Sequence, residues 1–97
     1  MKLERLNHYM KGTTSYHGFR VHCFKSDLDR LFGEAEVIRD GKTNYEWRLI
    51  DPETNKQITI YDWYTNEWHI GSETIEDSRE AAEVIGEMLK ELYSLQN

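Results

Sequence analysis

Three short runs of alternating residues, at 44–50, 57–63 and 67–71, constrain the fold of this chain more than any other feature. They contain all three tryptophans of the sequence. Because side chains two positions apart lie on the same face of a β-strand, the alternation predicts strands rather than helices. Good turn residues link the first two runs, and Pro52 suits the first corner of a turn. We therefore expect a three-stranded antiparallel sheet with one face turned to a core.

The two faces of this sheet are expected to differ in chemistry. The core face is predicted to hold Ile58, Ile60, Trp68 and Ile70. The outer face is predicted to hold Thr59, Tyr61, Trp63 and His69. Arg48 or one of its neighbours joins the outer face, according to the register of the first strand. A register slip of one residue would exchange the two faces, so alternation alone leaves this assignment open.

Further strands and a short helix are expected before this sheet in the sequence. Residues 16–24 alternate and predict a strand with a weak or bulged point at Gly18. Ser26 is expected to cap a short helix that stops at Gly33, and residues 34–39 are expected to form a brief strand. With these additions the sheet would have four or five short strands.

The two ends of the chain are predicted to be helical. Residues 1–10 carry apolar side chains at helical spacing, which favours a short amphipathic helix, with an edge strand as the alternative. Ser78 is expected to cap a long amphipathic helix over 79–95. The predicted fold class is α+β, with this helix packed on one face of the antiparallel sheet and one or two short helices beside it. One domain would span residues 1–97.

Composition excludes several classes of function. The net charge is -6, and it comes mainly from residues 73–97, where seven acidic residues stand against two basic ones. Generic binding to nucleic acid is therefore not expected, because it requires a basic face. The single cysteine, Cys23, cannot form an internal disulfide and fits a reducing compartment. No apolar run suggests a membrane span or a signal peptide, so we expect a cytoplasmic protein.

The histidines and the cysteine lack the spacing of a metal site. His17 and His22 are five positions apart, so on a regular strand they face opposite sides. A nucleophilic enzyme could use Cys23 or Ser15 with a histidine, but no motif that places a nucleophile surrounds either residue. A free cysteine on an apolar strand face is usually a small core residue. We therefore expect no metal, no cofactor and no catalytic residue.

The outer face of the sheet is the best candidate for a ligand site. Tyr61 and Trp63 offer flat rings on which a nucleobase can stack. The cations expected to hold a phosphate are Arg20, Lys42 and Arg48. The groups expected to bind or orient the rest of the ligand are Lys11, Thr14 and Ser15, from a hydroxyl-rich loop, and His69. The alternative is that the aromatic side chains only form a small second core.

Several motifs resemble those of a group of small, functionally uncharacterised phage-encoded proteins. They are Gly12-Thr13-Thr14-Ser15, Leu31-Phe32-Gly33, Glu46-Trp47, Ile60-Tyr61-Asp62-Trp63 and Trp68-His69-Ile70-Gly71, all within residues 11–72. The chain departs from the group at Tyr64, where a lysine is expected, and at Ser72, where a glycine is expected. A ligand contact made by that lysine would need another cation here. The resemblance implies expression in a bacterial cytoplasm, where phage proteins commonly counter host defence.

Together these observations predict a non-catalytic, phage-type anti-defence protein that sequesters a small nucleotide-derived immune signal of the host. The alternative is a protein-directed inhibitor, whose acidic C-terminal helix covers a basic site on a host defence nuclease or regulator. A chain of this length has little room for a deep pocket. We therefore expect a homodimer or a larger homo-oligomer.

Overall fold

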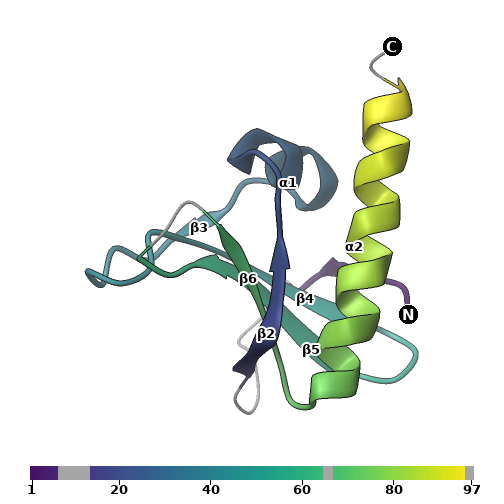
Figure 1. Ribbon diagram of the computed structural model, residues 1–97, viewed down its shortest axis with the longest axis horizontal. Helices are drawn as coiled ribbons and strands as arrows, with labels where there is room; N and C mark the ends of the chain where they lie inside the picture. Colours follow the sequence, from purple (N-terminus) through teal and green to yellow (C-terminus); the bar gives the residue numbers. More distant parts are fainter. Residues whose placement is uncertain (7–13, 65–66, 96–97) are drawn as a thin grey trace.

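The protein is an antiparallel sheet flanked by two helices (Figure 1). The computed structural model describes residues 1–6, 14–64 and 67–95. Its strands are β1 (Glu4–Arg5), β2 (Ser15–Val21), β3 (Glu36–Val37), β4 (Tyr45–Asp51), β5 (Lys56–Asp62) and β6 (Trp68–Ser72). Its helices are α1 (Lys25–Phe32) and α2 (Ile75–Leu95). The predicted α+β class is confirmed, with six strands in the described residues.

The strands follow the order β1-β4-β5-β6-β2, and β3 also pairs with β4. Every pairing is antiparallel. In the centre of the sheet Ile60 lies opposite Trp47 on one side and opposite Ile70 on the other. This register resolves the open assignment of the two faces, since these three side chains share the core face.

The core lies between this face of the sheet and the two helices. The sheet contributes Trp47, Leu49, Ile58, Ile60, Trp68 and Ile70, and the helices contribute Leu28, Phe32, Ala81, Ile85 and Leu89. The rings of Trp47 and Trp68 meet edge to face, with centroids 5.1 Å apart. Trp47 also donates its indole N–H to the carbonyl oxygen of Gly33 at 2.9 Å, so its polar atom is satisfied inside the core. Burial of each large side chain contributes about 1.5–3 kcal/mol.

The start of the chain is a strand in the residues that are described. Residues 4–5 form β1 on the edge of β4, and Leu6 donates its backbone N–H to the carbonyl of Arg48 at 2.9 Å. The predicted helix is therefore wrong over residues 1–6, and the edge strand is correct. Leu3 and Leu6 are both buried in this part of the chain. Their spacing of three residues therefore reflects burial and does not indicate a helix. Residues 7–10 of that prediction lie outside the described ranges.

Both helices begin earlier than their serines predict. The residue before α1 is Phe24, whose backbone N–H donates to Asp27 Oδ2 at 3.0 Å, so Ser26 is not the cap. Thr74 Oγ1 accepts the backbone N–H of Asp77 at 3.1 Å, so the first turn of α2 precedes Ser78. Ser78 is fully buried and its hydroxyl pairs with that of Ser72 instead. The predicted stop of α1 at Gly33 is confirmed by its positive φ of 86°.

Candidate ligand-binding site

The outer face of the sheet carries two cross-strand rows of side chains. The first row is Glu46, Tyr61, His69 and Arg20, taken from β4 to β2. The second row is Arg48, Thr59, Gly71 and Tyr16. Residues in such rows are close enough to contact one another. The register therefore groups the aromatic, imidazole and arginine residues that the sequence places on this face.

A bulge in β2 brings two residues of that strand together over β6. Tyr16 pairs with Gly71 and Arg20 pairs with His69, so four steps along β2 match two steps along β6. Gly18 lies between them with φ of 93°, a conformation that glycine adopts without strain. The predicted irregularity at Gly18 is confirmed. Its effect is that the Tyr16 ring stacks on His69, with centroids 4.3 Å apart and an interplanar angle of 14°.

Four side chains on this face enclose a hollow of about 310 Å³, which we call the aromatic hollow. Its lining residues are Tyr16, Tyr61, Trp63 and His69. The Tyr61 ring is nearly perpendicular to that of Trp63, at 87°, and to that of His69, at 76°. Trp63 follows β5 directly and is 40% exposed, so this wall of the hollow is accessible to solvent. Concave sites with mainly aromatic walls are typical of small-molecule binding.

A glycine and two threonines fix the backbone beside this hollow. Thr14 and Thr59 share a hydrogen bond between their hydroxyls at 2.9 Å. A Cβ atom on Gly71 would collide with the Thr59 hydroxyl and would come within 3.4 Å of Tyr61 Cε1. The absent side chain at Gly71 therefore makes room for both the threonine pair and the Tyr61 ring.

His69 is buried and uncharged at neutral pH. It is 7% exposed. Burial lowers the pKa of its imidazole from the ordinary 6.5, and the neighbouring Arg20 charge lowers it further. Burial also raises the pKa of the Tyr61 hydroxyl. Both shifts favour the neutral form of a side chain that lines the hollow.

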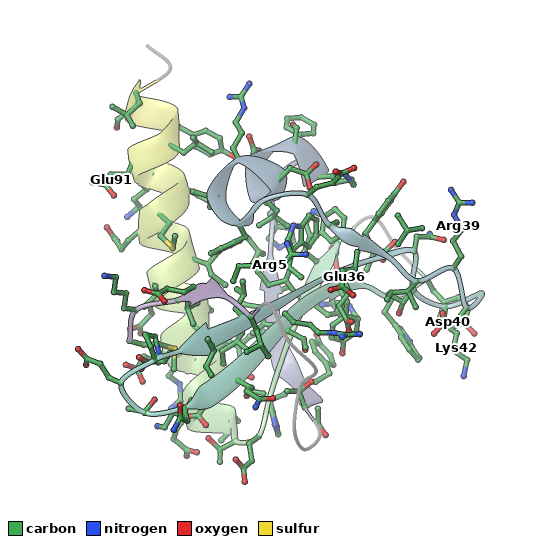
Figure 2. All side chains as sticks on the ribbon, turned by 180° about the vertical axis from the view of Figure 1, so that it is seen from behind. Arg5, Glu36, Arg39, Asp40, Lys42 and Glu91 are labelled. Carbon is green, nitrogen blue, oxygen red and sulfur yellow. The ribbon has the colours of Figure 1, made fainter. Side chains whose placement is uncertain are left out.

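Two cations lie against the outermost rings of the hollow. Arg20 donates from Nε to the Tyr16 hydroxyl at 2.8 Å and forms an ion pair with Glu67. Its guanidinium carbon is 5.9 Å from the centre of the Tyr16 ring. Lys42 Nζ is 5.6 Å from the centre of the Trp63 ring. In Figure 2, Lys42 lies with Arg39 and Asp40 at the tip of the β3–β4 turn.

The other expected site residues have different positions. Arg48 is one cross-strand row away and contacts two carboxylates, Glu46 at 3.0 Å and Glu36 at 3.7 Å. Ser15 precedes Tyr16 in β2, so strand alternation directs its side chain to the opposite face. Lys11 lies outside the described residues. The structure thus gathers Tyr61, Trp63 and His69 at the hollow, places Thr14 beside it, and sets Arg20 and Lys42 at its rim.

Two residues of this region were not among the sequence-derived candidates. Tyr16 forms a wall of the hollow, and Glu67 binds the arginine at its rim. The alternation of 16–24 already puts Tyr16 on the same side as Arg20, and that signal was available. Nothing in the sequence pairs Glu67 with Arg20, which lies 47 positions earlier.

Cys23 lies away from the aromatic hollow and is half-buried. Burial, with a smaller effect of Asp27, raises the pKa of its thiol to about 12. Its thiolate, the reactive form, is scarcely populated at neutral pH. Within the described ranges no three histidine, cysteine, aspartate or glutamate side chains are grouped as metal ligands would be.

A second hollow, of about 510 Å³, opens on the core side between the start of α1 and the start of β4. Phe24, Lys25, Tyr45 and Asp62 are among its lining residues. The polar groups here are occupied within the protein. Lys25 binds Asp29 at 2.7 Å, and Asp62 Oδ1 accepts two backbone N–H groups of β4 and the residue before it, each at 2.9 Å. The aromatic hollow is therefore the better candidate site.

The fold and the hollow define a small α+β protein with an aromatic surface pocket. No family model, curated protein or solved structure matches the chain. In the part of the chain that the structure describes, no helix is long and apolar enough to cross a membrane.

Proposed function

We propose that this chain is a non-catalytic binding protein that captures a small nucleotide-derived ligand. The observation that carries the proposal is the aromatic hollow, with three neutral aromatic side chains, a neutral imidazole and two cations at its rim. Stacking of a base on an aromatic ring contributes about 1–3 kcal/mol and tolerates different bases. Lys42 and Arg20 are then in place for a phosphate outside the hollow.

The rim arginine is available at low cost. The Arg20 side chain is 45% exposed and that of Glu67 is 38% exposed. Exposed ion pairs of this kind contribute little to stability because water and salt screen them, so a phosphate can displace the carboxylate. The Tyr16 hydroxyl keeps Arg20 oriented during such an exchange. Arg48, which contacts two carboxylates, is a less accessible partner for phosphate than the sequence suggests.

The resemblance to phage-encoded proteins supports a biological setting for this binding. In that setting the protein sequesters a nucleotide-derived immune signal in the host bacterial cytoplasm, and so blunts a defence response. The neutral walls of the hollow offer a flat ring surfaces for stacking, and they offer it hydrogen bonds. Such walls fit capture of the ligand without cleavage.

Calorimetry against a panel of cyclic nucleotides and ADP-ribose-type molecules tests the proposal. Trp63→Leu should reduce affinity at least about fivefold, since it removes one stacking surface. Phe24→Leu is the matched control, because Phe24 is an exposed aromatic residue at the second hollow. No heat for any panel member at high micromolar protein would overturn the proposal. Mass spectrometry of the recovered ligand distinguishes capture from cleavage.

The acidic face of α2 favours the second candidate, an inhibitor directed at a basic protein. Its exposed carboxylates are Glu76, Glu80, Glu83, Glu87 and Glu91. Figure 2 shows Glu91 on the side of α2 away from the sheet. Replacement of Glu83, Glu87 and Glu91 by lysine separates the two functions. Loss of anti-defence activity with unchanged nucleotide binding would support the inhibitor, and unchanged activity would exclude it.

A further inference from the structure

The walls of the aromatic hollow present electron-rich surfaces at right angles to one another. The Tyr61 and Trp63 rings are at 87°, and their centroids are 6.4 Å apart. Each ring carries negative charge density on its two faces. A flat neutral base can stack on only one of two perpendicular walls. A positive charge in the corner between them is attracted by both rings, which is how aromatic cages bind quaternary ammonium groups.

Two cations of the protein already lie over rings that line the hollow. Lys42 lies over Trp63 and Arg20 lies over Tyr16, both within 6 Å of the ring centre. That is the range of a cation–π interaction. Two of the rings that line the hollow, Tyr16 and Trp63, thus already lie next to a cation of the same molecule.

The charged side chains around the hollow balance one another. Three cations, Arg20, Lys42 and Arg48, stand among three carboxylates, those of Glu36, Glu46 and Glu67. Their sum is three positive against three negative charges, or zero. Glu46 is also the direct cross-strand neighbour of Tyr61. His69, the remaining lining residue, adds no positive charge at neutral pH because its pKa is lowered.

We infer that the hollow selects a nucleotide whose base carries a positive charge, such as an N-alkylated purine or a pyridinium, over the same nucleotide with a neutral base. This inference rests on the proposed function and narrows its ligand class. The cationic base lies in the corner that the Tyr61 and Trp63 rings form, and its phosphate lies toward Lys42 at the rim. The positive base of the ligand thus contacts the aromatic rings, and its negative phosphate contacts the lysine.

Guanosine monophosphate and its N7-methylated form are the probes, because they differ by one methyl group and one positive charge. The wild-type protein should bind the methylated form about three- to thirtyfold more tightly, the span that one cation–π contact supplies. Oxidised and reduced nicotinamide mononucleotide form a second pair, with a cationic and a neutral ring of similar shape. The preference should have the same direction in both pairs.

The ratio of affinities within a pair also identifies the residue responsible. Trp63→Leu should reduce the ratio, because only the Tyr61 ring then remains in the corner, while Phe24→Leu should leave it unchanged, because Phe24 lies outside the hollow. The wild-type ratios decide the inference even if a variant fails to fold. Equal affinities, or tighter binding of the neutral form, would overturn the inference and leave the proposed function standing. No binding of any of the four probes would count against both.

Discussion

Gly71→Ala is the most informative single substitution in this protein. The new Cβ atom would collide with Thr59 Oγ1 and would lie 3.2 Å from Thr14 Oγ1. Gly71 is buried in β6, between β5 and β2, so the backbone has no open side into which to move. The Thr59 hydroxyl must therefore turn away, which breaks its 2.9 Å hydrogen bond to Thr14.

The cost follows from these contacts. Overpacking by one methyl group in a packed region costs about 1–3 kcal/mol. Loss of the threonine hydrogen bond costs about 0.5–1.5 kcal/mol. Alanine recovers about 0.5–1 kcal/mol, because it loses less backbone entropy than glycine on folding. The free energy of unfolding should therefore fall by about 0.5–4 kcal/mol, which lowers the Tm by about 4–8 °C for each kcal/mol.

Urea denaturation of matched variants measures this cost. Gly86→Ala adds the same methyl group in α2, where no atom beyond the adjoining residues and the helix's own backbone lies within 4 Å of the new Cβ. That variant should gain about 0.5–1 kcal/mol from helix propensity. In a Thr59→Ala background the cost of Gly71→Ala should fall to less than about half, because the colliding hydroxyl is gone. If Gly71→Ala is as stable as the wild type, or if its cost is unchanged without the Thr59 hydroxyl, the steric reasoning is refuted.

Three further predictions concern buried polar groups. The folded protein holds the pKa of the His69 imidazole below 6.5. As the pH falls, the unfolded chain therefore takes up the imidazole proton at a higher pH than the folded protein does. The free energy of unfolding should thus decrease as the pH drops below about 6.5. Urea midpoints at about pH 7.5 and about pH 5.5 should therefore differ more in the wild type than in His69→Gln, and an equal difference would contradict this. Asp62→Asn should cost about 1–3 kcal/mol in the same assay, because its new amide group would face the Asn44 amide that now donates to Asp62 Oδ2 at 3.2 Å. If Asp62→Asn left the free energy of unfolding unchanged, the contact between Asp62 and Asn44 would not contribute to stability. Cys23, with its pKa near 12, should react slowly with a disulfide reagent at neutral pH and much faster in urea, and fast reaction of the native protein would contradict its burial.

The core face could be predicted from the sequence because alternation survives wherever a strand is buried on one side. Ile58, Ile60, Trp68 and Ile70 are all in the core, as their spacing predicts. The helix starts could not be predicted as well, because Thr74 and Ser78 are equally good caps by residue type. The choice between them depends on Ser72, whose hydroxyl binds Ser78 and removes it from the surface.

The candidate site was predictable in its residues and not in its shape. Strand alternation places Tyr61 and His69 outward, and the structure agrees. The Tyr16 ring stacks on His69 because β2 has two more residues than β6 in the bulge around Gly18. The sequence of β2 alone does not predict how this bulge changes the pairing with β6. The partners of Arg48 include Glu36, which only the pairing of β3 with β4 brings near.

The irregularity of β2 also affects how copies of this protein can meet. β2 is one border of the sheet, and its bulge interrupts the row of backbone groups that a regular strand would present. The opposite border is formed by β1 and β3, each of which pairs with two residues of β4. Within residues 1–6, 14–64 and 67–95, neither border presents a long regular strand for strand addition. Self-assembly through these described borders should therefore use side-chain surfaces and should not extend the sheet from one molecule into the next.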